Sequence, residues 1–232
     1  MRKIFIDGGA NKGQSTQKFI ECFNDSKEYE IYMFEPEHKN CTKYIDKIIN
    51  KFDDHNIEYI KNALWKNNDM VTIPSSNCGE SSSIFNTNTH SNHYKVNSTR
   101  LSEWIQNNFD EEDYIILKLD IEGAEYEVVE DLYETKILGY INEFHGELHG
   151  PKKGKRMIDD LKLIERLKKY DLKLYTWNGS NKIKSIYHSY YDHETMIREY
   201  KKWSKRNYPT DDFMKEIKIY LSDTDDWRKK NL

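Results

Sequence analysis

Strand-like and helix-like segments alternate along most of this chain, and the alternation constrains its fold more than any other feature. Short apolar runs typical of buried strands are separated by segments whose apolar residues recur at helical spacing. The expected strands span 4–6, 31–34, 57–60, 114–119, 140–145 and 172–177, and the expected helices include 41–52, 124–132 and 157–170. Since parallel strands need such crossovers, the pattern predicts an α/β, doubly wound, mostly parallel sheet of the seven-stranded type with helices on both faces.

The segments outside this alternation are more polar. Between Pro74 and Leu101, 16 of 26 residues are Ser, Thr, Asn or Gly, so the insertion at about 75–100 is either a substrate loop or a disordered spacer. A small extra strand is expected just before it, at 70–73. After about residue 178 the pattern loosens, and the expected elements there are a strand at 183–187, a helix at 193–206 and an edge strand at 217–221. Because no linker separates two cores, residues 1–232 are expected to form one domain.

Composition sets limits on where the protein works. No apolar run approaches the ~18 residues of a membrane-spanning helix. The opening MRKIFIDGG lacks the apolar stretch of a secretory signal, which argues against export by that route. Cys22, Cys41 and Cys78 are odd in number and far apart, so they predict neither a disulfide framework nor a zinc knuckle. We therefore expect three reduced thiols and a cytoplasmic protein.

The net charge of −4 hides an uneven distribution. Residues 1–145 hold 15 Lys and Arg against 26 Asp and Glu, whereas residues 146–232 hold 21 against 14. The two halves are expected to face different ligands, unless lysine-rich helices such as 162–169 are merely solvated faces.

A glycine loop follows the first expected strand. The segment DGGANKG at 7–13 matches the pattern G-x-A-x-x-G between a strand and a helix. Glycines there permit a tight turn and close approach of a ligand, and the helix N-terminus offers free N–H groups to an anion. The alternative is a tight turn that binds nothing.

Glu35 ends the second expected strand, 28 residues after Asp7. A carboxylate at that position can accept both hydrogen bonds of an adenosine ribose diol, while Pro36 stops the strand. The loop and this acid fit a NAD site and an S-adenosylmethionine site equally well.

A third motif, LKLDIEGAE at 117–125, closes the fourth strand of the main series. The period of two places Lys118 and Asp120 on one face, with Asp120 at the carboxyl end where ligands bind in open α/β sheets. A buried lysine needs a carboxylate or must reach the cleft, and Asp120 is its nearest partner by spacing. Glu122 and Glu125 also fit a simpler role, in which they cap the helix that follows.

In these motifs the chain resembles the FkbM family of S-adenosylmethionine-dependent O-methyltransferases, over roughly residues 3–149. The segments that carry the resemblance are IFIDGGANKGQST at 4–16, FEPEHKN at 34–40, KNALWKNNDMVTIP at 61–74, STRLSEWI at 98–105 and LKLDIEGAEYEVVEDL at 117–132. The resemblance implies a Rossmann-like class I methyltransferase fold. It also implies methylation of a sugar hydroxyl on a glycan or glycoconjugate.

The resemblance further implies a cofactor site for S-adenosylmethionine. Glu35 would hold the ribose, the loop would line the methionine part, and Asp120 would lie at the methyl-transfer end. The full expected set is Asp7, Gly8, Gly9, Ala10, Gly13, Gln14, Ser15, Glu35, Pro36, Asn62, Ala63, Leu64 and Asp120.

Catalytic candidates come from the ends of the fourth and fifth strands. Glu143 and His145 share a face and are expected to open beside Asp120, with Lys118 nearby. A histidine suits removal of the proton from an alcohol, so His145 is the first choice of base and Glu143 the second. His145 could instead only hydrogen-bond the loop end. Asp120, Glu143, His145 and His149 could in principle bind a metal, but no sharp ligand spacing supports one, so none is predicted.

The acceptor side is expected to include Ser82 and Ser83 of the polar insertion and Lys152 and Lys153 after the fifth strand. These lysines would suit an anionic carbohydrate. One alternative is an RNA ribose 2′-O-methyltransferase, for which Lys118, Asp120 and Glu143 could serve, although the acidic net charge argues against nucleic acid. A second alternative is a cofactor-binding module without turnover.

Overall fold

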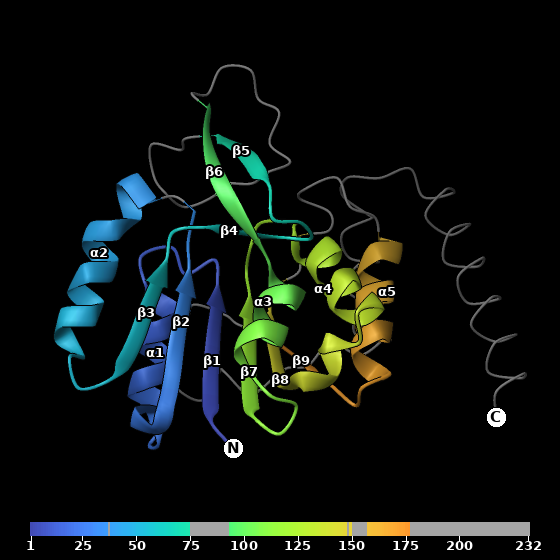
Figure 1. Cartoon of the computed structure of the whole chain (residues 1–232), viewed down its shortest axis with the longest axis horizontal. Helices are drawn as coiled ribbons and strands as arrows, with labels where there is room; N and C mark the ends of the chain where they lie inside the picture. Colours follow the sequence, from blue (N-terminus) through green and yellow to red (C-terminus); the bar gives the residue numbers. More distant parts are fainter. Residues whose placement is uncertain (37, 75–92, 148, 150–156, 177–232) are drawn as a thin grey trace, which may run out of the picture.

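A six-stranded parallel sheet forms the centre of the molecule (Figure 1). The computed structural model describes residues 1–36, 38–74, 93–147, 149 and 157–176. Within them the strand order is β3-β2-β1-β7-β8-β9, and every neighbouring pair is parallel. The strands are β1 (Lys3–Gly8), β2 (Tyr29–Phe34), β3 (Asn56–Ile60), β7 (Tyr114–Leu119), β8 (Ile141–Gly146) and β9 (Leu174–Thr176).

Helices cover both faces of this sheet. The helices are α1 (Gln14–Cys22), α2 (His38–Lys51), α3 (Leu101–Asn108), α4 (Glu125–Glu134) and α5 (Met157–Lys168), with 3₁₀ turns η1 (Ser26–Glu28) and η2 (Ile137–Tyr140). Apolar residues of α1 and α2 pack with Phe5 of β1, whereas those of α3, α4 and α5 pack with Ile4 and Ile6. The two cores follow from the period of two along β1, which sends alternate side chains to opposite faces.

The strand order confirms the expected doubly wound α/β fold. The chain winds one way through β1, β2 and β3 and then returns to pair β7 with β1, so the order reverses between β1 and β7. In open sheets of this kind, ligands bind at the carboxyl ends of the strands beside such a reversal. The described residues contain six strands in the main sheet, and the expected strands at 183–187 and 217–221 lie outside the described residues.

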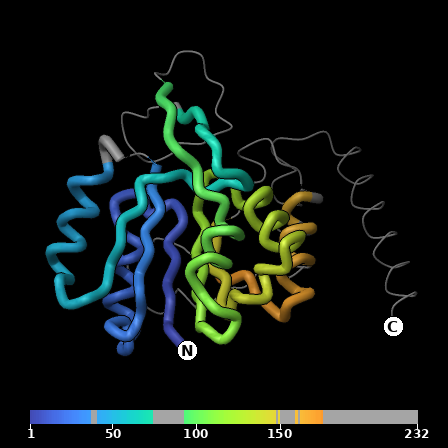
Figure 2. Tube along the Cα trace, viewed as in Figure 1, coloured from blue at the N-terminus to red at the C-terminus, as the bar shows by residue number. Residues whose placement is uncertain are grey.

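A second, three-stranded sheet stands beyond the carboxyl ends of the central strands (Figure 1). It contains β4 (Ala63–Trp65), β5 (Met70–Pro74) and β6 (His93–Arg100), in the order β4-β6-β5. The chain begins at the opposite end of the main sheet, as the trace in Figure 2 shows. The small sheet therefore flanks the side of the molecule where a ligand is expected.

Strand β6 corrects the sequence-based expectation for the end of the polar insertion. Residues 93–100 were expected to belong to a loop or spacer, but they pair with both β4 and β5. Val96 and Ser98 are buried on one face, and the Ser98 hydroxyl donates hydrogen bonds to the carbonyls of Asn67 and Asp69, both 2.8 Å away. Polar residues suit this strand because their hydrogen bonds are satisfied inside it. The extra strand expected at 70–73 is confirmed as β5.

Two further expectations concern membranes and thiols. Within the described ranges, no helix has both the length and the apolar character needed to cross a bilayer. Cys22 and Cys41 carry free thiols, whereas Cys78 lies outside the described residues.

Candidate active site at the carboxyl ends of the central strands

The glycine loop between β1 and α1 is fixed against the ends of two neighbouring strands. The N–H groups of Gly9 and Ala10 donate to the Phe34 carbonyl at the end of β2, at 2.9 and 3.0 Å. Gly9 has φ +74°, and a Cβ on it would lie 2.0 Å from the carbonyl oxygen of Asp120. A side chain is therefore excluded at Gly9 on both counts. The loop lies directly beside the residue that ends β7.

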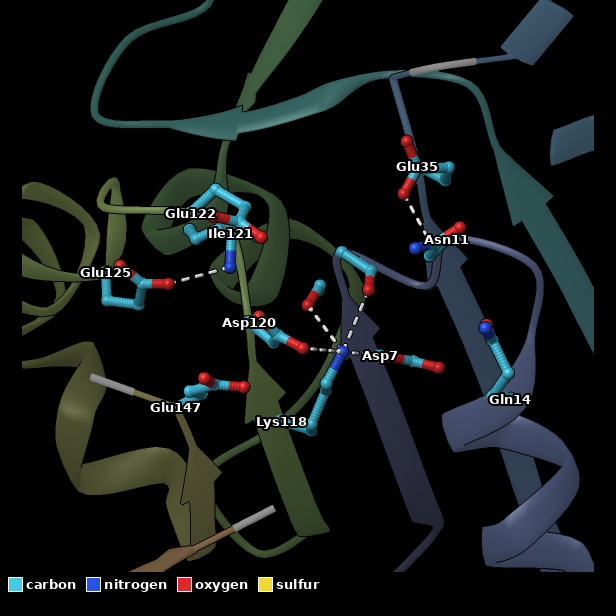
Figure 3. A network of polar contacts seen from close by, with 12 residues as sticks. Asp7, Asn11, Gln14, Glu35, Lys118, Asp120, Ile121, Glu122, Glu125 and Glu147 are labelled. Atoms are coloured by element: carbon cyan, nitrogen blue, oxygen red, sulfur yellow. Dashed lines mark hydrogen bonds and ion pairs between the residues drawn. The ribbon is translucent and has the colours of Figure 1, made fainter. Parts of the chain in front are cut away.

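Glu35 also anchors this loop. Its Oε2 accepts a hydrogen bond of 2.7 Å from the N–H of Asn11, and the residue is buried (Figure 3). Asn11 adopts φ +51°, a left-handed conformation that an asparagine tolerates better than most residues. The acid predicted to hold a ribose thus stands at the end of β2 and also fixes the loop that faces the same edge.

Asp7 and Lys118 form a fully buried ion pair under the loop. Lys118 Nζ lies 3.0 Å from Asp7 Oδ1, and Thr16 Oγ1 donates to Asp7 Oδ2 at 2.8 Å. Lys118 also donates to the carbonyls of Gly9, at 2.8 Å, and Gly8, at 3.2 Å. Burial by itself lowers the pKa of Lys118, but the charges of Asp7 and Asp120 outweigh it and raise the pKa above its ordinary value. Lys118 therefore stays charged and positions the glycine loop.

This pairing corrects the expected partner of Lys118. Spacing along β7 favoured Asp120, yet Asp120 Oδ2 lies 3.9 Å from Nζ, farther than Asp7. The reason is the register, which places Asp7 directly across from Lys118 on the neighbouring strand. Lys118 and Asp7 are both 0% exposed, so each is placed to act on a ligand through the loop rather than by direct contact.

Beside the loop, Asp120, Glu122 and His149 converge. His149 Nε2 lies 3.6 Å from Asp120 Oδ1 and 3.8 Å from Glu122 Oε2, and Glu147 Oε1 is also 3.8 Å away. The His149 side chain is only 4% exposed, whereas that of Asp120 is 30% exposed. Burial lowers the pKa of His149, but its hydrogen bond to Glu125 and the charges of Glu125, Glu122 and Asp120 raise the pKa above its usual value.

Glu125 holds this cluster together. Its Oε1 accepts the N–H of Ile121 and its Oε2 accepts that of Gly123, each at 2.8 Å, while His149 Nδ1 lies 3.0 Å from Oε1. Glu125 therefore fixes the turn before α4 and does not cap that helix as predicted, because the N-cap residue Ala124 makes no side-chain cap hydrogen bond. Glu122 instead has φ +56°, a left-handed turn in which its carboxylate lies within 3.8 Å of His149.

His145 does not occupy the position expected for it. The register places it across from Lys118, two residues before Asp120, and it is 0% exposed. Its Nε2 lies 3.3 Å from Glu143 Oε2, and its ring stacks on Tyr175 with centroids 5.2 Å apart. The hydrogen bond from His145, together with one from Tyr114, lowers the pKa of Glu143 against the opposing effect of burial. The histidine beside Asp120 is His149.

The other predicted residues lie around the same edge. Asn62 Nδ2 donates to Thr99 Oγ1 at 3.0 Å, and Ala63 and Leu64 are buried beside it. Gln14 Oε1 accepts the N–H of Lys12 at 3.0 Å. Ser15 is buried in the first turn of α1, and Pro36 is half-buried directly after Glu35. The acceptor candidates Ser82, Ser83, Lys152 and Lys153 lie outside the described residues.

Sequence reasoning missed the residues that join the cluster from outside the strands. Glu122 was assigned only a possible cap, Glu147 was given no role, and His149 was considered with Asp120 only as part of a metal set that was not predicted. One signal was available. His145, Glu147 and His149 are each two residues apart, which is the period of an extended chain. If the chain continues in that way after β8, His149 comes to lie beyond the end of β7.

These features define a Rossmann-like α/β protein whose ligand edge lies at the reversal of strand order. The family model described as Methyltransferase FkbM domain matches residues 7–170, so the chain belongs to the FkbM methyltransferase family. The matched span includes the glycine loop, Glu35, Asp120 and His149. A search of curated proteins and a search of solved structures both give no match.

Proposed function

We propose that this protein is an S-adenosylmethionine-dependent O-methyltransferase that methylates a sugar hydroxyl of a glycan or glycoconjugate. The observation that carries the proposal is the convergence of the glycine loop, Glu35 and Asp120 at one edge of the sheet. Membership of the FkbM family supports a methyltransferase, and that family generally uses S-adenosylmethionine.

The residues at this edge fit that cofactor. The loop at 8–13 would hold its methionine part, Glu35 its ribose and Asn62–Leu64 its adenine, with Asp120 nearest the methyl group. When bound, the cofactor supplies an electrophilic methyl group on a cationic sulfur. The N–H of Asp120 donates a hydrogen bond of 3.0 Å to the Gly8 carbonyl, which ties Asp120 to the start of the loop. Its carboxylate is partly exposed.

The charge of the edge favours this cofactor over NAD. Asp7 and Lys118 neutralise each other inside the protein, which leaves the carboxylates of Glu35, Asp120 and Glu122 around the loop. A negative edge attracts a cationic sulfonium and repels the anionic pyrophosphate of NAD. The charge of the edge therefore favours S-adenosylmethionine over NAD, whereas the loop and Glu35 alone fit both cofactors equally well.

The protein's own groups account for both parts of the transfer. Held by the rigid loop and by strand ends, the two reactants would be aligned, which is worth up to about 7–11 kcal/mol in favourable cases. The cluster of Asp120, Glu122 and His149 is placed to bind the acceptor hydroxyl and to take up its proton. Carboxylates also accept hydrogen bonds from the neighbouring hydroxyls of a sugar, which supports a carbohydrate acceptor.

The test is transfer of a labelled methyl group to defined acceptors. Purified protein is incubated with methyl-labelled S-adenosylmethionine and, in parallel, with oligosaccharides, a glycolipid or RNA. We expect label on a carbohydrate hydroxyl as an ether that survives mild alkali. Label on RNA ribose would support the alternative function instead, and label lost in mild alkali would indicate a carboxyl ester. Glu35→Ala should abolish most transfer, whereas the exposed Glu134→Gln should not.

A further inference from the structure

We propose that Asp120, Glu122 and His149 form a binding site for one divalent first-row transition-metal ion, with Mn²⁺ as a suitable occupant. The expectation from sequence was that no metal site exists, because no helical ligand pair is present. The three residues instead come from the end of β7, the left-handed turn after it and the segment after β8. Binding of the ion does not depend on the proposed function, whereas its role in catalysis does.

The donor atoms already lie close enough to share one ion. One ligand atom from each of the three residues lies within 4.8 Å of the others. Ligand atoms at about 2.0–2.2 Å from a common ion lie at most about 4.4 Å apart, so only a small contraction of the cluster is needed. The cluster borders the glycine loop, since Asp120 also lies 3.9 Å from Lys118 Nζ.

The orientation of His149 points to the same conclusion independently. Its side chain is 4% exposed, and its Nδ1 is held by Glu125 at 3.0 Å, so that Nε2 faces the carboxylates. In the part of the chain that the structure describes, no hydrogen bond reaches Nε2. Its distances of 3.6 and 3.8 Å are too long for one. A histidine that binds a metal through one nitrogen commonly donates the N–H of its other nitrogen to a carboxylate, and Glu125 is placed to accept it here.

A simple ion pair accounts less well for these distances. A protonated imidazole would draw a carboxylate to about 2.7–2.9 Å. Four carboxylates, from Asp120, Glu122, Glu125 and Glu147, instead lie within 3.8 Å of the two nitrogens of one imidazole. Lys118 offsets this charge only in part, because its Nζ lies 3.0 Å from Asp7 and 3.9 Å from Asp120. A divalent cation would balance this excess of negative charge.

The donor set also narrows the choice of ion. Two carboxylate oxygens and one imidazole nitrogen suit Mn²⁺, Fe²⁺ or Zn²⁺ better than Mg²⁺ or Ca²⁺, which prefer oxygen ligands throughout. Three protein ligands leave positions open for an acceptor. If the proposed function holds, an ion there would draw electron density from the acceptor hydroxyl and ease loss of its proton.

Metal binding is tested on the full chain after chelation and dialysis. Mn²⁺ is titrated and its free fraction is followed by electron paramagnetic resonance, with Zn²⁺ as a competitor. We expect one saturable site per chain, from which Zn²⁺ displaces Mn²⁺. Glu122→Gln and His149→Gln should each weaken Mn²⁺ binding by at least about tenfold, while circular dichroism shows an intact fold. The control Glu134→Gln, which removes the same charge from the far end of α4, should bind like the parent.

Two outcomes would overturn the site: no saturable binding of Mn²⁺, or unchanged affinity in both variants. The proposed function fails separately. If Mn²⁺ binds one site but calorimetry detects no S-adenosylhomocysteine binding, the metal site stands and the cofactor assignment falls. If S-adenosylhomocysteine binds but Mn²⁺ does not, the proposed function stands without the metal.

Discussion

Lys118 and Asp7 place opposite charges inside the protein, next to the loop that faces the ligand edge. Each is fully buried, and each would be costly to bury alone. Together with Thr16 they satisfy one another and tie the glycine carbonyls to β7. Lys118, a catalytic candidate in the sequence, thus acts as a buried residue that positions the glycine loop.

Removing only one member of this pair should destabilise the protein strongly. Lys118→Met leaves the Asp7 carboxylate buried without a cation, which costs about 3–5 kcal/mol of unfolding free energy. Urea denaturation measures the loss. The double variant Asp7→Asn with Lys118→Met should recover a large part of it, because no uncompensated charge remains. A single variant as stable as the parent would contradict the role given to the pair.

We expect the conformation of Glu122 to lower the stability of the protein while it places the carboxylate in the site. Its φ of +56° is unfavourable for a residue with a side chain, and its carboxylate lies among others. Glu122→Gly should therefore raise the unfolding free energy of the metal-free protein by about 1 kcal/mol. Lys136 also has a positive φ, +65°, but lies away from the site. Lys136→Gly is therefore the matched control, and its unfolding free energy should rise by less. A Glu122→Gly variant less stable than the parent would show that the turn is not strained.

Among the elements, the turn from β1 into α1 depends most on a single small residue. Gly9→Ala would bring a methyl group to 2.0 Å from the Asp120 carbonyl, so the loop and the end of β7 must separate. We expect a loss of about 2–4 kcal/mol in stability and loss of cofactor binding. Thermal unfolding and calorimetry measure the two effects. Gly139→Ala, whose added Cβ would meet only the Tyr170 ring at 3.2 Å, should cost less than about 1 kcal/mol and keep binding.

The elements also show how far the sequence alone could lead. The strands of the main sheet were predicted because each contains a short run of apolar residues. β6 was not, because its polar residues are satisfied by partners such as Asn67 and Asp69 that lie elsewhere in the sequence. β4 and α3 were also not anticipated. In the site, Glu35 and Asp120 were placed at strand ends by spacing, but the pairing of Lys118 depends on register, which spacing along one strand does not reveal.

At the scale of the whole molecule, function depends on where the fold gathers charge. The strand order brings the ends of β1, β2 and β7 together, and with them Glu35 and Asp120. Helices cover both faces of the main sheet, and the small sheet of β4, β5 and β6 flanks this edge (Figure 1). The acids are far apart in the sequence, and the parallel topology places them at the same edge of the sheet.

The role of Glu35 gives a graded prediction. Glu35→Ala removes both the expected ribose contact and the hydrogen bond from Asn11, so cofactor affinity should fall by about 2 kcal/mol, or roughly thirtyfold. Glu35→Gln keeps an acceptor for the Asn11 N–H, so its cofactor affinity should lie between that of Glu35→Ala and that of the parent. Calorimetry with S-adenosylhomocysteine distinguishes these outcomes. Equal affinities in all three proteins would mean that Glu35 only supports the loop.

The central claim is that this edge binds a sulfonium cofactor, and calorimetric titration of the parent protein tests it most directly. S-adenosylmethionine, S-adenosylhomocysteine and NAD are titrated separately into the full chain under the same buffer conditions. We predict saturable 1:1 binding of S-adenosylmethionine and its demethylated product, and no measurable binding of NAD, because the carboxylates at the edge disfavour a pyrophosphate. Binding of NAD more tightly than S-adenosylhomocysteine would contradict the claim.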